Sequence, residues 1–360
     1  MFGFWGRGLL SIALFGALAA CSGGSDSAAN PGGAGSGAGG ADSHGCVAAP
    51  DAVFAAQQFG DTDLIRQIQV EGDTLYFRTQ DSLLKVPTSG GSPELLADLG
   101  SQEPSEFWVL SDSLLVRSDA ELFTVPKTGG QPTTLGAALT PAPTNFAATQ
   151  LSGSDFYWVA KAASDYGIYH RELSGTAIDT VYSTKDDIFG LQLVAGKLYF
   201  QNRTAADLES VPIDGGSPIK LVDADASDEL VAGDAKSLYV IGSLGVASST
   251  NYGLYRQPVS GDAARLLEMG LFISDALDTV AADNGEYFAA PANVSPNHAD
   301  PTDVAPALLF AAPTDSEAQL RWCIDSSYTL HALAVQDKTA YISVYSASAN
   351  RATIARVTLP

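Results

Sequence analysis

The sequence predicts an all-β protein built as a single β-propeller, and three observations support this prediction. The first is a repeated unit of roughly 40 residues, which runs from about residue 61 to the end of the chain. The second is the content of each clear copy, in which runs rich in Leu, Tyr, Phe and Val alternate with Gly-Gly turns. The third is that apolar residues rarely recur at the i, i+3, i+4 spacing of a helix, which disfavours stacked α-helical repeats. Several short strands per unit at this period are typical of propeller blades.

The repeated unit is clearest in its first copy. Asp73–Phe77 reads Asp-Thr-Leu-Tyr-Phe, Leu83–Pro87 reads Leu-Leu-Lys-Val-Pro, and Gly90-Gly91 follows. The two glycines suit a turn that needs positive φ, and the proline removes an amide donor where strand pairing stops. We therefore expect four strands in each unit. They are an inner strand such as Ile65–Val70, the two strands just named, and a short outer strand after the turn.

The unit recurs along the chain at a regular distance. Pro126 of the second copy lies 39 residues after Pro87, and Pro212 of the fourth lies 86 residues after Pro126, which equals two units of 43. The Leu-Tyr-Phe element and its weaker counterparts lie at 73–77, 113–116, 155–158, 197–200, 237–240, 286–288 and 340–342. This spacing favours seven blades, with six as the alternative.

The two ends of the chain predict how the ring closes. The last copy stops at its third strand, because the chain given ends at Pro360. A blade that lacks its outer strand would leave an unpaired sheet edge. Val47–Phe59 precedes the first complete unit and lacks a partner there. We expect this segment to supply the missing outer strand of the last blade.

The first residues have the three parts of a secretory signal. Met1–Arg7 carries one positive charge, Gly8–Ala19 is apolar, and small residues precede Cys21. The cysteine directly after the small residues resembles the lipobox of bacterial lipoproteins. The resemblance implies cleavage before Cys21 and acylation of its thiol and its new amine, and two or more acyl chains anchor a protein stably. The alternatives are an ordinary secreted protein with a chance cysteine, or a short membrane anchor. We assign residues 1–20 to the signal peptide, 21–45 to the lipidated cysteine and its tether, and 46–360 to the propeller.

Residues 22–45 read as a flexible tether, since they are almost all Gly, Ala, Ser and Asp and have no apolar period. Their mean reach is about 27 Å, by the square-root scaling of a flexible linker. Ser22, directly after the anchor cysteine, resembles the outer-membrane default of Gram-negative lipoproteins. We therefore expect a lipid-anchored protein of the cell envelope. The outer membrane is the favoured location, and the sequence does not assign the protein to its periplasmic or its outer surface.

The repeat itself resembles the propeller-repeat lipoproteins of Gram-negative bacteria, especially those of the myxobacterial type. Their units read D-x-x-x-Y-W/F and L-x-x-V-P-x-x-G-G-x-P-x-x-L. The pattern is also similar, more loosely, to the repeats of TolB-like propellers. The resemblance covers about residues 61–360 and is strongest in the first, second and fourth units. It implies the fold and the location, and it carries over no catalytic residue.

The net charge of −22 limits the classes of partner that the protein can bind. Such a charge disfavours nucleic acids and anionic lipid surfaces. We expect contact with the membrane through the lipid anchor only, a protein or glycan partner in the envelope, and a monomeric chain.

Three cysteines are present. With Cys21 assigned to lipid, Cys46 and Cys323 remain as an even pair in an oxidising compartment. Cys46 would lie at the outer rim of the last blade, and Cys323 would end the outer strand of the blade before it. A disulfide between them is expected, and two free thiols are the alternative.

The motifs of common catalytic sites are absent from the sequence. It contains no G-x-S-x-G elbow, P-loop or H-E-x-x-H pair. Of the four histidines, only His331 falls in an expected inner strand, where its side chain could face the central channel. We therefore expect no catalytic residue and no cofactor, with calcium as the one alternative.

Two polar segments are candidate sites. Asp223, Asp225 and Asp228 begin like a calcium-binding loop, but the turn glycine and the final glutamate of such loops are missing. A solvated acidic turn is the favoured interpretation. The second segment is a long polar stretch, a candidate binding loop with the residues Asn293, Asn297, Asp300 and Asp303. A plain surface insertion is its alternative.

The aromatic residues Trp108, Phe156, Tyr157 and Trp158 stand at strand spacing, so we expect them in the core between blades rather than on a sugar-binding surface. Taken together, the sequence favours a lipid-anchored binding or scaffold module over an enzyme. The alternative is a calcium-dependent propeller hydrolase or lactonase with a site in the channel.

Overall fold

The computed structural model describes residues 49–59, 64–100, 104–144, 148–244, 253–269, 281–283, 287–294, 305–311 and 319–359. The chain divides into two units, Met1–Ala38 and Gly39–Pro360, and every described residue belongs to the second. None of the described residues forms a helix that is long and apolar enough to cross a membrane.

The described residues form antiparallel sheets in which neighbouring strands follow each other in the chain. The first three sheets are β1 (Gln67–Glu71), β2 (Thr74–Arg78), β3 (Ser82–Pro87) and β4 (Glu94–Asp98); β5 (Glu106–Val109), β6 (Ser113–Ser118), β7 (Glu121–Pro126) and β8 (Thr133–Thr134); and β9 (Thr149–Ser152), β10 (Asp155–Ala162), β11 (Asp165–Glu172) and β12 (Asp179–Thr184). The next two are β13 (Ile188–Val194), β14 (Lys197–Asn202), β15 (Asp207–Pro212) and β16 (Ile219–Asp223); and β17 (Glu229–Gly233), β18 (Ser237–Gly242), β19 (Gly253–Pro258) and β20 (Arg265–Met269). The last two are β21 (Ala281–Asp283), β22 (Tyr287–Val294), β23 (Ala305–Ala311) and β24 (Gln319–Cys323); and β25 (Tyr328–Gln336), β26 (Thr339–Ser346) and β27 (Arg351–Thr358).

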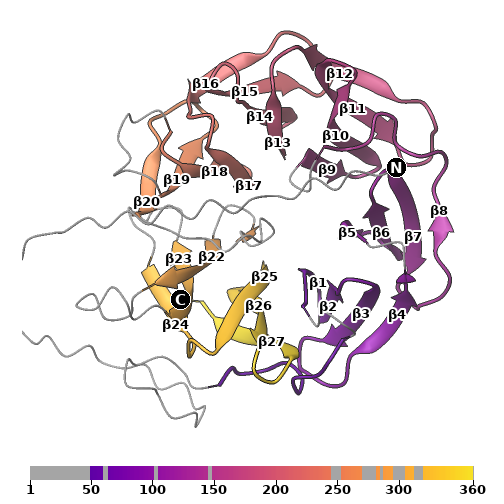
Figure 1. Ribbon diagram of the computed structural model, residues 1–360, viewed down its shortest axis with the longest axis vertical. Coiled ribbons are helices and arrows are strands. Elements are labelled where there is room, and N and C mark those ends of the chain that lie inside the picture. Colours follow the sequence, from indigo (N-terminus) through magenta and orange to yellow (C-terminus); the bar gives the residue numbers. More distant parts are fainter. Residues whose placement is uncertain are drawn as a thin grey trace, which may run out of the picture. The chain divides into compact units, whose positions relative to one another are not determined.

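These sheets stand around a common axis (Figure 1), with the first strand of each sheet innermost and its last strand at the rim. Within the described residues, six sheets have four strands and the sheet β25–β27 has three. The predicted all-β propeller is therefore confirmed. We call each sheet a blade and number the blades in chain order.

A recurring turn explains the Pro-x-x-Gly-Gly motif. The amide of Gly90 donates to the carbonyl of Pro87 at 2.9 Å, and Gly129 and Pro126 form the same bond at 2.8 Å. Gly90 has φ +101° and Gly129 has φ +82°, values that favour glycine. The next glycine then contacts the preceding blade, because the amide of Gly130 donates to the carbonyl of Leu96 on β4 at 3.1 Å.

The N-terminal segment closes the ring, as predicted. Its residues bridge to β27 at Ala52↔Ala355 and Gln57↔Ala352. In addition, Gly91 in the turn of blade 1 donates to the carbonyl of Val53 at 3.3 Å. This bond repeats the contact that Gly130 makes with Leu96. The segment therefore takes the place of an outer strand for the last blade, although it forms isolated bridges rather than a regular strand.

Buried side chains between adjacent blades make up the core. Phe54 of the closing segment, for example, packs with Phe77 of blade 1 and with Ile354 of the last blade in one cluster. Phe156 and Trp158 are fully buried between blades 2 and 3, and Tyr157 is 5% exposed. These three residues confirm the prediction of an aromatic inter-blade core, whereas Trp108 is only half-buried.

A candidate binding site at the propeller axis

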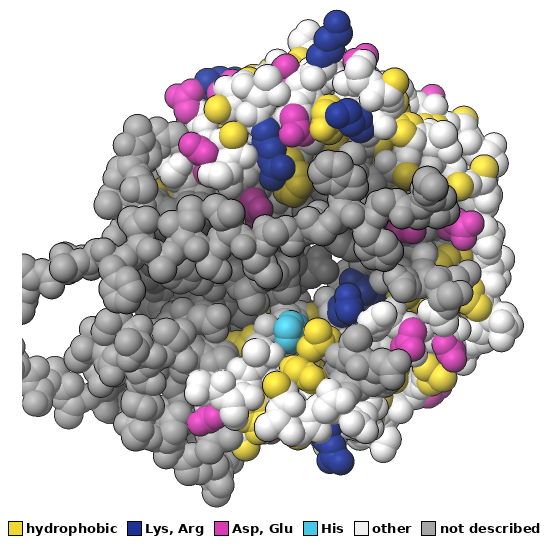
Figure 2. Space-filling model, viewed as in Figure 1, with side chains coloured by type: hydrophobic (Ala, Val, Ile, Leu, Met, Phe, Trp, Pro, Cys, Tyr) yellow, Lys and Arg dark blue, Asp and Glu magenta, His cyan; other side chains and the backbone are white. Residues whose placement is uncertain are grey.

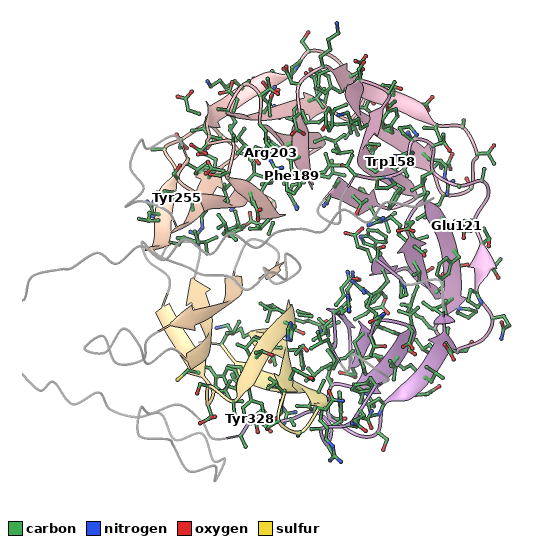
Figure 3. All side chains as sticks on the ribbon, viewed as in Figure 1. Glu121, Trp158, Phe189, Arg203, Tyr255 and Tyr328 are labelled. Atoms are coloured by element: carbon green, nitrogen blue, oxygen red, sulfur yellow. The ribbon has the colours of Figure 1, made fainter. Side chains whose placement is uncertain are left out.

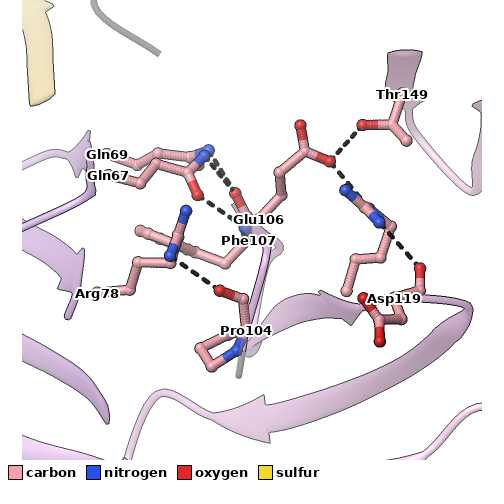
Figure 4. A network of polar contacts seen from close by, with 9 residues as sticks. Gln67, Gln69, Arg78, Pro104, Glu106, Phe107, Asp119 and Thr149 are labelled. Carbon is pink, nitrogen blue, oxygen red and sulfur yellow. Dashed lines mark hydrogen bonds and ion pairs between the residues drawn. The ribbon is translucent and has the colours of Figure 1, made fainter. Parts of the chain in front are cut away.

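Side-chain amides of the innermost strands join neighbouring blades. Gln67 and Gln69 of β1 reach β5, the inner strand of blade 2 (Figure 4). The Phe107 amide donates to Gln67 Oε1 at 2.8 Å, and the Val109 amide donates to Gln69 Oε1 at 3.0 Å. Both glutamine Nε2 groups donate in turn to the Phe107 carbonyl, at 3.1 Å and 2.7 Å. These bonds satisfy backbone groups that the edge of β5 would otherwise expose to the channel.

Blade 2 holds blade 3 through a buried ion pair. Arg117 Nε donates to Glu106 Oε2 at 3.0 Å, and its Nη1 donates to the carbonyl of Asp119 at 2.8 Å. Thr149 of β9 donates its hydroxyl to the same Glu106 oxygen (Figure 4). Both charged side chains are at most 10% exposed. Because a buried charge is tolerated only when it is paired, this network fixes the spacing of the two blades.

One register position recurs around the axis, and we call it the axial layer. Its members pair with residues of the second strand in six blades: Gln69 with Tyr76, Trp108 with Leu115, Gln150 with Tyr157, Gln192 with Tyr199, Ala232 with Tyr239, and Ala334 with Tyr341. Gln150 Nε2 donates to the Leu191 carbonyl of β13 at 2.8 Å, so it joins blades 3 and 4 in the way that Gln69 joins blades 1 and 2. Trp108 stands where a joining glutamine would stand in blade 2.

An axial cavity of about 410 Å³ opens beside this layer. It is lined by residues 68–70 of β1, by Gln192, and by residues 231–233 and 333–335 of β17 and β25. Among the described residues, no charged side chain lines it, in a chain whose net charge is −22. Ala232 and Ala334 occupy the layer positions where other blades carry Gln or Trp, so these blades contribute less bulk at the axis.

Gln192 differs from the other glutamines of the axial layer. Its side-chain amide makes no hydrogen bond to any described residue, and its Oε1 lies against Gly233, 3.4 Å from the point that a β-carbon would occupy there. A glutamine amide offers two N–H donors and an acceptor oxygen. The axial cavity therefore presents an uncharged hydrogen-bonding group that the described residues leave available.

A second hollow, of about 630 Å³, lies across blades 1, 2 and 3, and we call it the hairpin groove. It is lined where the inner strands turn into the second strands, by the residues Gln69, Glu71, Trp108, Val109, Leu110, Ser111, Leu151, Gly153, Ser154 and Leu173. Gln69 lines both hollows. The axial cavity and the hairpin groove therefore adjoin each other at this residue.

Trp108 contributes the aromatic part of the hairpin groove. Its ring packs edge-on against Phe156 of blade 3, with the ring centroids 5.3 Å apart. The half-buried side chains Leu110, Leu151 and Leu173 complete an apolar lining. Aromatic and aliphatic linings with few polar groups are typical of binding pockets.

One ion pair, between Lys127 and Glu71, lies at the rim of the hairpin groove. Lys127 donates from Nζ to Glu71 Oε2 and to the carbonyl of Ser111, the latter at 2.9 Å. The Lys127 ammonium also lies 5.7 Å from the centroid of the Tyr76 ring. The Glu71 side chain is 50% exposed, whereas that of Lys127 is only 15% exposed. The carboxylate therefore faces solvent at the rim of the groove.

Cationic groups occur at the other end of the inner strands. The Arg203 guanidinium lies over the ring of Phe189 at 3.7 Å (Figure 3), near the start of β13. His331, near the start of β25, is 3.0 Å from the hydroxyl of Thr329. Burial and the positive charge of Arg66 lower the pKa of His331. Figure 2 shows a hollow near the middle of the ring, with Lys or Arg and His side chains beside it.

The structure places the three predicted calcium ligands in separate interactions. Asp223 pairs with Lys220 at 2.5 Å, and Asp225 accepts from the amide of Ser227 at 2.9 Å. Asp228 is buried and accepts three backbone amides. Across the described part of the chain, no three His, Cys, Asp or Glu side chains gather in a way that could hold a metal ion.

The other predicted sites lie partly outside the described residues. Asn293 lies in β22, opposite Pro306 of β23, so it belongs to a strand and not to the predicted loop. Asn297, Asp300 and Asp303 lie outside the described residues, as do Cys21 and Cys46. Cys323 is buried at the end of β24.

Sequence reasoning missed the axial layer and the hairpin groove. A signal for both was present, since Gln69, Gln150 and Gln192 each precede the tyrosine of their unit by seven residues. Trp108 precedes Leu115 by the same distance. Aligning the units on that tyrosine rather than on the prolines would have shown that Trp108 replaces a glutamine.

Comparisons with known proteins agree with the architecture. No protein-family model and no curated protein sequence matches the chain. Among solved structures, it is similar to the structure of U3-55K, with a TM-score of 0.58 and 12% identity over 86% of this chain and 100% of that one. It is similar to an oligogalacturonate lyase from Vibrio parahaemolyticus, with a TM-score of 0.57 and 8% identity over 85% of this chain and 91% of that one.

A third similar structure is the CNH domain of AfRom2, with a TM-score of 0.55 and 12% identity over 85% of this chain and 98% of that one. At these identities the likenesses concern the fold and not the activity. The blades, the closing segment and the comparisons together identify the second unit of this chain as a β-propeller.

Proposed function

We propose that this protein is a lipid-anchored binding module of the cell envelope. In this proposal residues 1–20 are removed, Cys21 carries the lipid, residues 21–45 form the tether, and the propeller binds a protein or glycan partner. The outer membrane is the favoured location, in line with Ser22 after the anchor cysteine. The repeat's resemblance to propeller-repeat lipoproteins supports the same assignment.

The observation that carries the binding role is the meeting of two unlike hollows at Gln69. The axial cavity offers uncharged hydrogen-bonding groups, including the Gln192 amide. The hairpin groove offers an aromatic and aliphatic lining. A polar anchor point beside an apolar groove is an arrangement that orients a ligand while burying part of its surface.

Binding can be tested with the full-length protein in a non-ionic detergent. The probes are purified peptidoglycan fragments, envelope oligosaccharides and detergent-soluble envelope proteins, measured by calorimetry. Gln192→Ala removes the available amide, and Trp108→Ala removes the aromatic lining. We expect at least one probe to bind and either variant to weaken that binding about tenfold, which corresponds to about 1.4 kcal/mol. Binding that neither variant alters would place the ligand elsewhere and refute this site.

The anchor has its own test. Cys21→Ser should abolish incorporation of labelled palmitate and release the protein from the membrane fraction, because acyl chains supply the membrane affinity. Cys46→Ser is the matched control and should retain the label. A Cys21→Ser protein that remains in the membrane fraction would contradict the lipoprotein assignment.

A second candidate function is a propeller hydrolase or lactonase with a channel site that uses calcium. The observation in its favour is His331, because a lowered pKa keeps its imidazole neutral and able to accept a proton near neutral pH. Turnover of lactone or ester substrates that depends on added calcium and is lost in His331→Gln would support it. No turnover, together with an unchanged melting temperature in calcium, would exclude it.

A further inference from the structure

We propose that the hairpin groove receives an extended segment of a partner protein that carries basic side chains between apolar ones. This inference rests on the proposed binding function and names the partner chemistry of one of its two hollows. It follows from the apolar lining of the groove, from the charges around its rim, and from an internal lysine that already uses the rim carboxylate.

The lining of the groove suits apolar side chains. Trp108, Leu110, Leu151 and Leu173 are each half-buried, so part of their apolar surface stays open to the groove. They come from blades 2 and 3, which the Glu106–Thr149 bond holds together. Because the strands that carry the lining are joined by hydrogen bonds, the groove is preorganised, and binding a ligand would require little reordering of the protein.

The hairpins that surround the groove carry acids. The turns between the first and second strands hold Glu71 and Asp73 in blade 1, Asp112 in blade 2 and Asp155 in blade 3. None of these three hairpins contains a lysine or an arginine. The corresponding hairpins of three other blades each contain a lysine, namely Lys197, Lys236 and Lys338, which in two of them stands close to an aspartate, Asp234 or Asp337. Among the described hairpins, those whose acids have no lysine in the same turn therefore surround the apolar groove, and charge complementarity selects a basic partner.

Lys127 shows how a basic side chain can occupy the rim. Its ammonium bonds Glu71 and the Ser111 carbonyl, and both of these residues line the groove. A partner lysine or arginine would compete for, or share, this half-exposed carboxylate. The lysine of the chain itself therefore sets the affinity, and its removal should strengthen the binding of a basic segment.

The test uses full-length protein in a non-ionic detergent and an acetylated, amidated peptide of sequence KLSKLSKL. The control peptide is ELSELSEL. Binding is followed by calorimetry and by the change in tryptophan fluorescence. We expect KLSKLSKL to bind and ELSELSEL not to bind. An equal response to both peptides would overturn the inference.

Two variants with opposite expected effects on the affinity for KLSKLSKL make the test specific. Glu71→Gln should weaken binding of KLSKLSKL at least fivefold, and Lys127→Met should strengthen it about threefold. Glu121→Gln is the matched control, because it removes one exposed carboxylate at the far end of blade 2 (Figure 3) and should leave affinity unchanged. Circular dichroism melting confirms that each variant is folded.

Each remaining outcome decides between the two proposals. If Glu121→Gln weakens binding as much as Glu71→Gln does, the peptide responds to net charge and the inference fails. If KLSKLSKL does not bind but an oligosaccharide binds and depends on Gln192, the binding function stands and this inference fails. If no probe of any class binds, both proposals fail.

Discussion

Asp228 shows how one buried carboxylate can hold two loops of a blade. Its Oδ2 accepts the amides of Asp225 at 2.7 Å and Leu244 at 3.0 Å, and its Oδ1 accepts the amide of Ser243 at 2.7 Å. The side chain ties the connection before β17 to the turn after β18. Gly242 leaves the space for it, because a β-carbon there would lie 1.9 Å from Oδ1. Burial raises the pKa of Asp228, and the backbone amides oppose that rise.

We expect Asp228→Ala to lower the free energy of unfolding by about 2–4 kcal/mol, because three backbone amides lose their acceptor inside the protein. Urea unfolding followed by fluorescence measures the difference. Asp214→Asn, at an exposed position, is the control and should change stability by less than about 0.5 kcal/mol. A loss as small as that of the control would mean that water replaces the carboxylate.

His331 gives the protein a measurable pH dependence. Its pKa in the folded protein lies below the usual value of 6.5, because burial and Arg66 disfavour the charged form. Between the lower pKa of His331 in the folded protein and the usual value of 6.5 in the unfolded chain, the unfolded chain binds more protons. The contribution of a neutral His331 to the free energy of unfolding is therefore fully present above pH 6.5, and it is lost as the pH falls through the folded-state pKa.

Removing the imidazole of His331 should make the free energy of unfolding depend less on pH. His331→Gln is expected to lose less stability than the parent protein between about pH 7.5 and about pH 5.5, measured by urea unfolding at both pH values. His170→Gln is a useful comparison, since that imidazole is bonded to Asp155 at 2.8 Å. Identical pH dependence in the His331→Gln and parent proteins would show that this residue titrates equally in both states.

At the scale of elements, the repeat predicted the second and third strands most clearly, and the inner strand expected at Ile65–Val70 corresponds to β1 (Gln67–Glu71), shifted toward the C-terminus. The Asp73–Phe77 run corresponds to β2, shifted by one residue, and Leu83–Pro87 lies within β3. These strands repeat because both of their faces are buried between blades, so their apolar residues cannot vary freely. The inner strands instead read QIQVE, EFWV and TQLS in blades 1 to 3. Their polar residues join blades individually, so the inner strands share little beyond the glutamine that stands seven residues before the tyrosine in three units.

The candidate site was hidden for the same physical reason. Trp108 was expected in the core because it stands at strand spacing among other aromatic residues. It contacts Phe156 as expected, but it also lines the hairpin groove. Burial on one side and exposure on the other cannot be read from residue type, because it depends on which inner strands approach the axis.

The closing segment is the element on which the ring depends. Phe54 is 4% exposed, stacks on Phe77 with the centroids 5.7 Å apart, and meets the edge of Phe59 at 5.9 Å. Nearby, Thr353 of β27 donates its hydroxyl to the Phe54 carbonyl at 2.5 Å. The segment therefore combines strand-like bonds with an aromatic contact to blade 1.

We expect Phe54→Ala to destabilise the propeller by about 3–5 kcal/mol, the usual cost of removing a buried phenylalanine. The exposed Gln58→Ala in the same segment should be close to neutral. Thermal unfolding of both variants distinguishes these expectations. Equal melting temperatures for the two variants would mean that the segment is not part of the cooperative fold.

At the scale of the whole molecule, the Cys46–Cys323 disulfide stays a prediction, since Cys46 lies outside the described residues. Ile324, next to Cys323, packs in one cluster with Val357 and Leu359 at the end of the last blade. The amide of Arg356 donates to the Asp51 carbonyl at 2.8 Å, and Cys46 precedes Asp51 by five residues. Ile324 and Asp51 therefore both contact the last blade, and the sequence places Cys323 directly before the first and Cys46 five residues before the second.

A disulfide there would close a loop of about 277 residues, for which chain-entropy models give a stabilisation of about 5 kcal/mol as an upper figure. We expect Cys46→Ser and Cys323→Ser each to lower the melting temperature, and the double variant to fall no further than either single variant, because each single variant already removes the same bond. Mass spectrometry of a non-reduced digest should show the linked peptides. Linked peptides from any other cysteine pair would refute the assignment.

The closing segment also bears on the order of events during synthesis. A chain that leaves the ribosome starting from its amino end presents Val53 and Phe54 early, while β27, which they contact in the folded protein, is made last. Until β27 is made, the apolar side of the first blade that these residues cover lacks its partner. Completion of the ring is thus coupled to completion of the chain, and a chain truncated before β27 would remain an open ring.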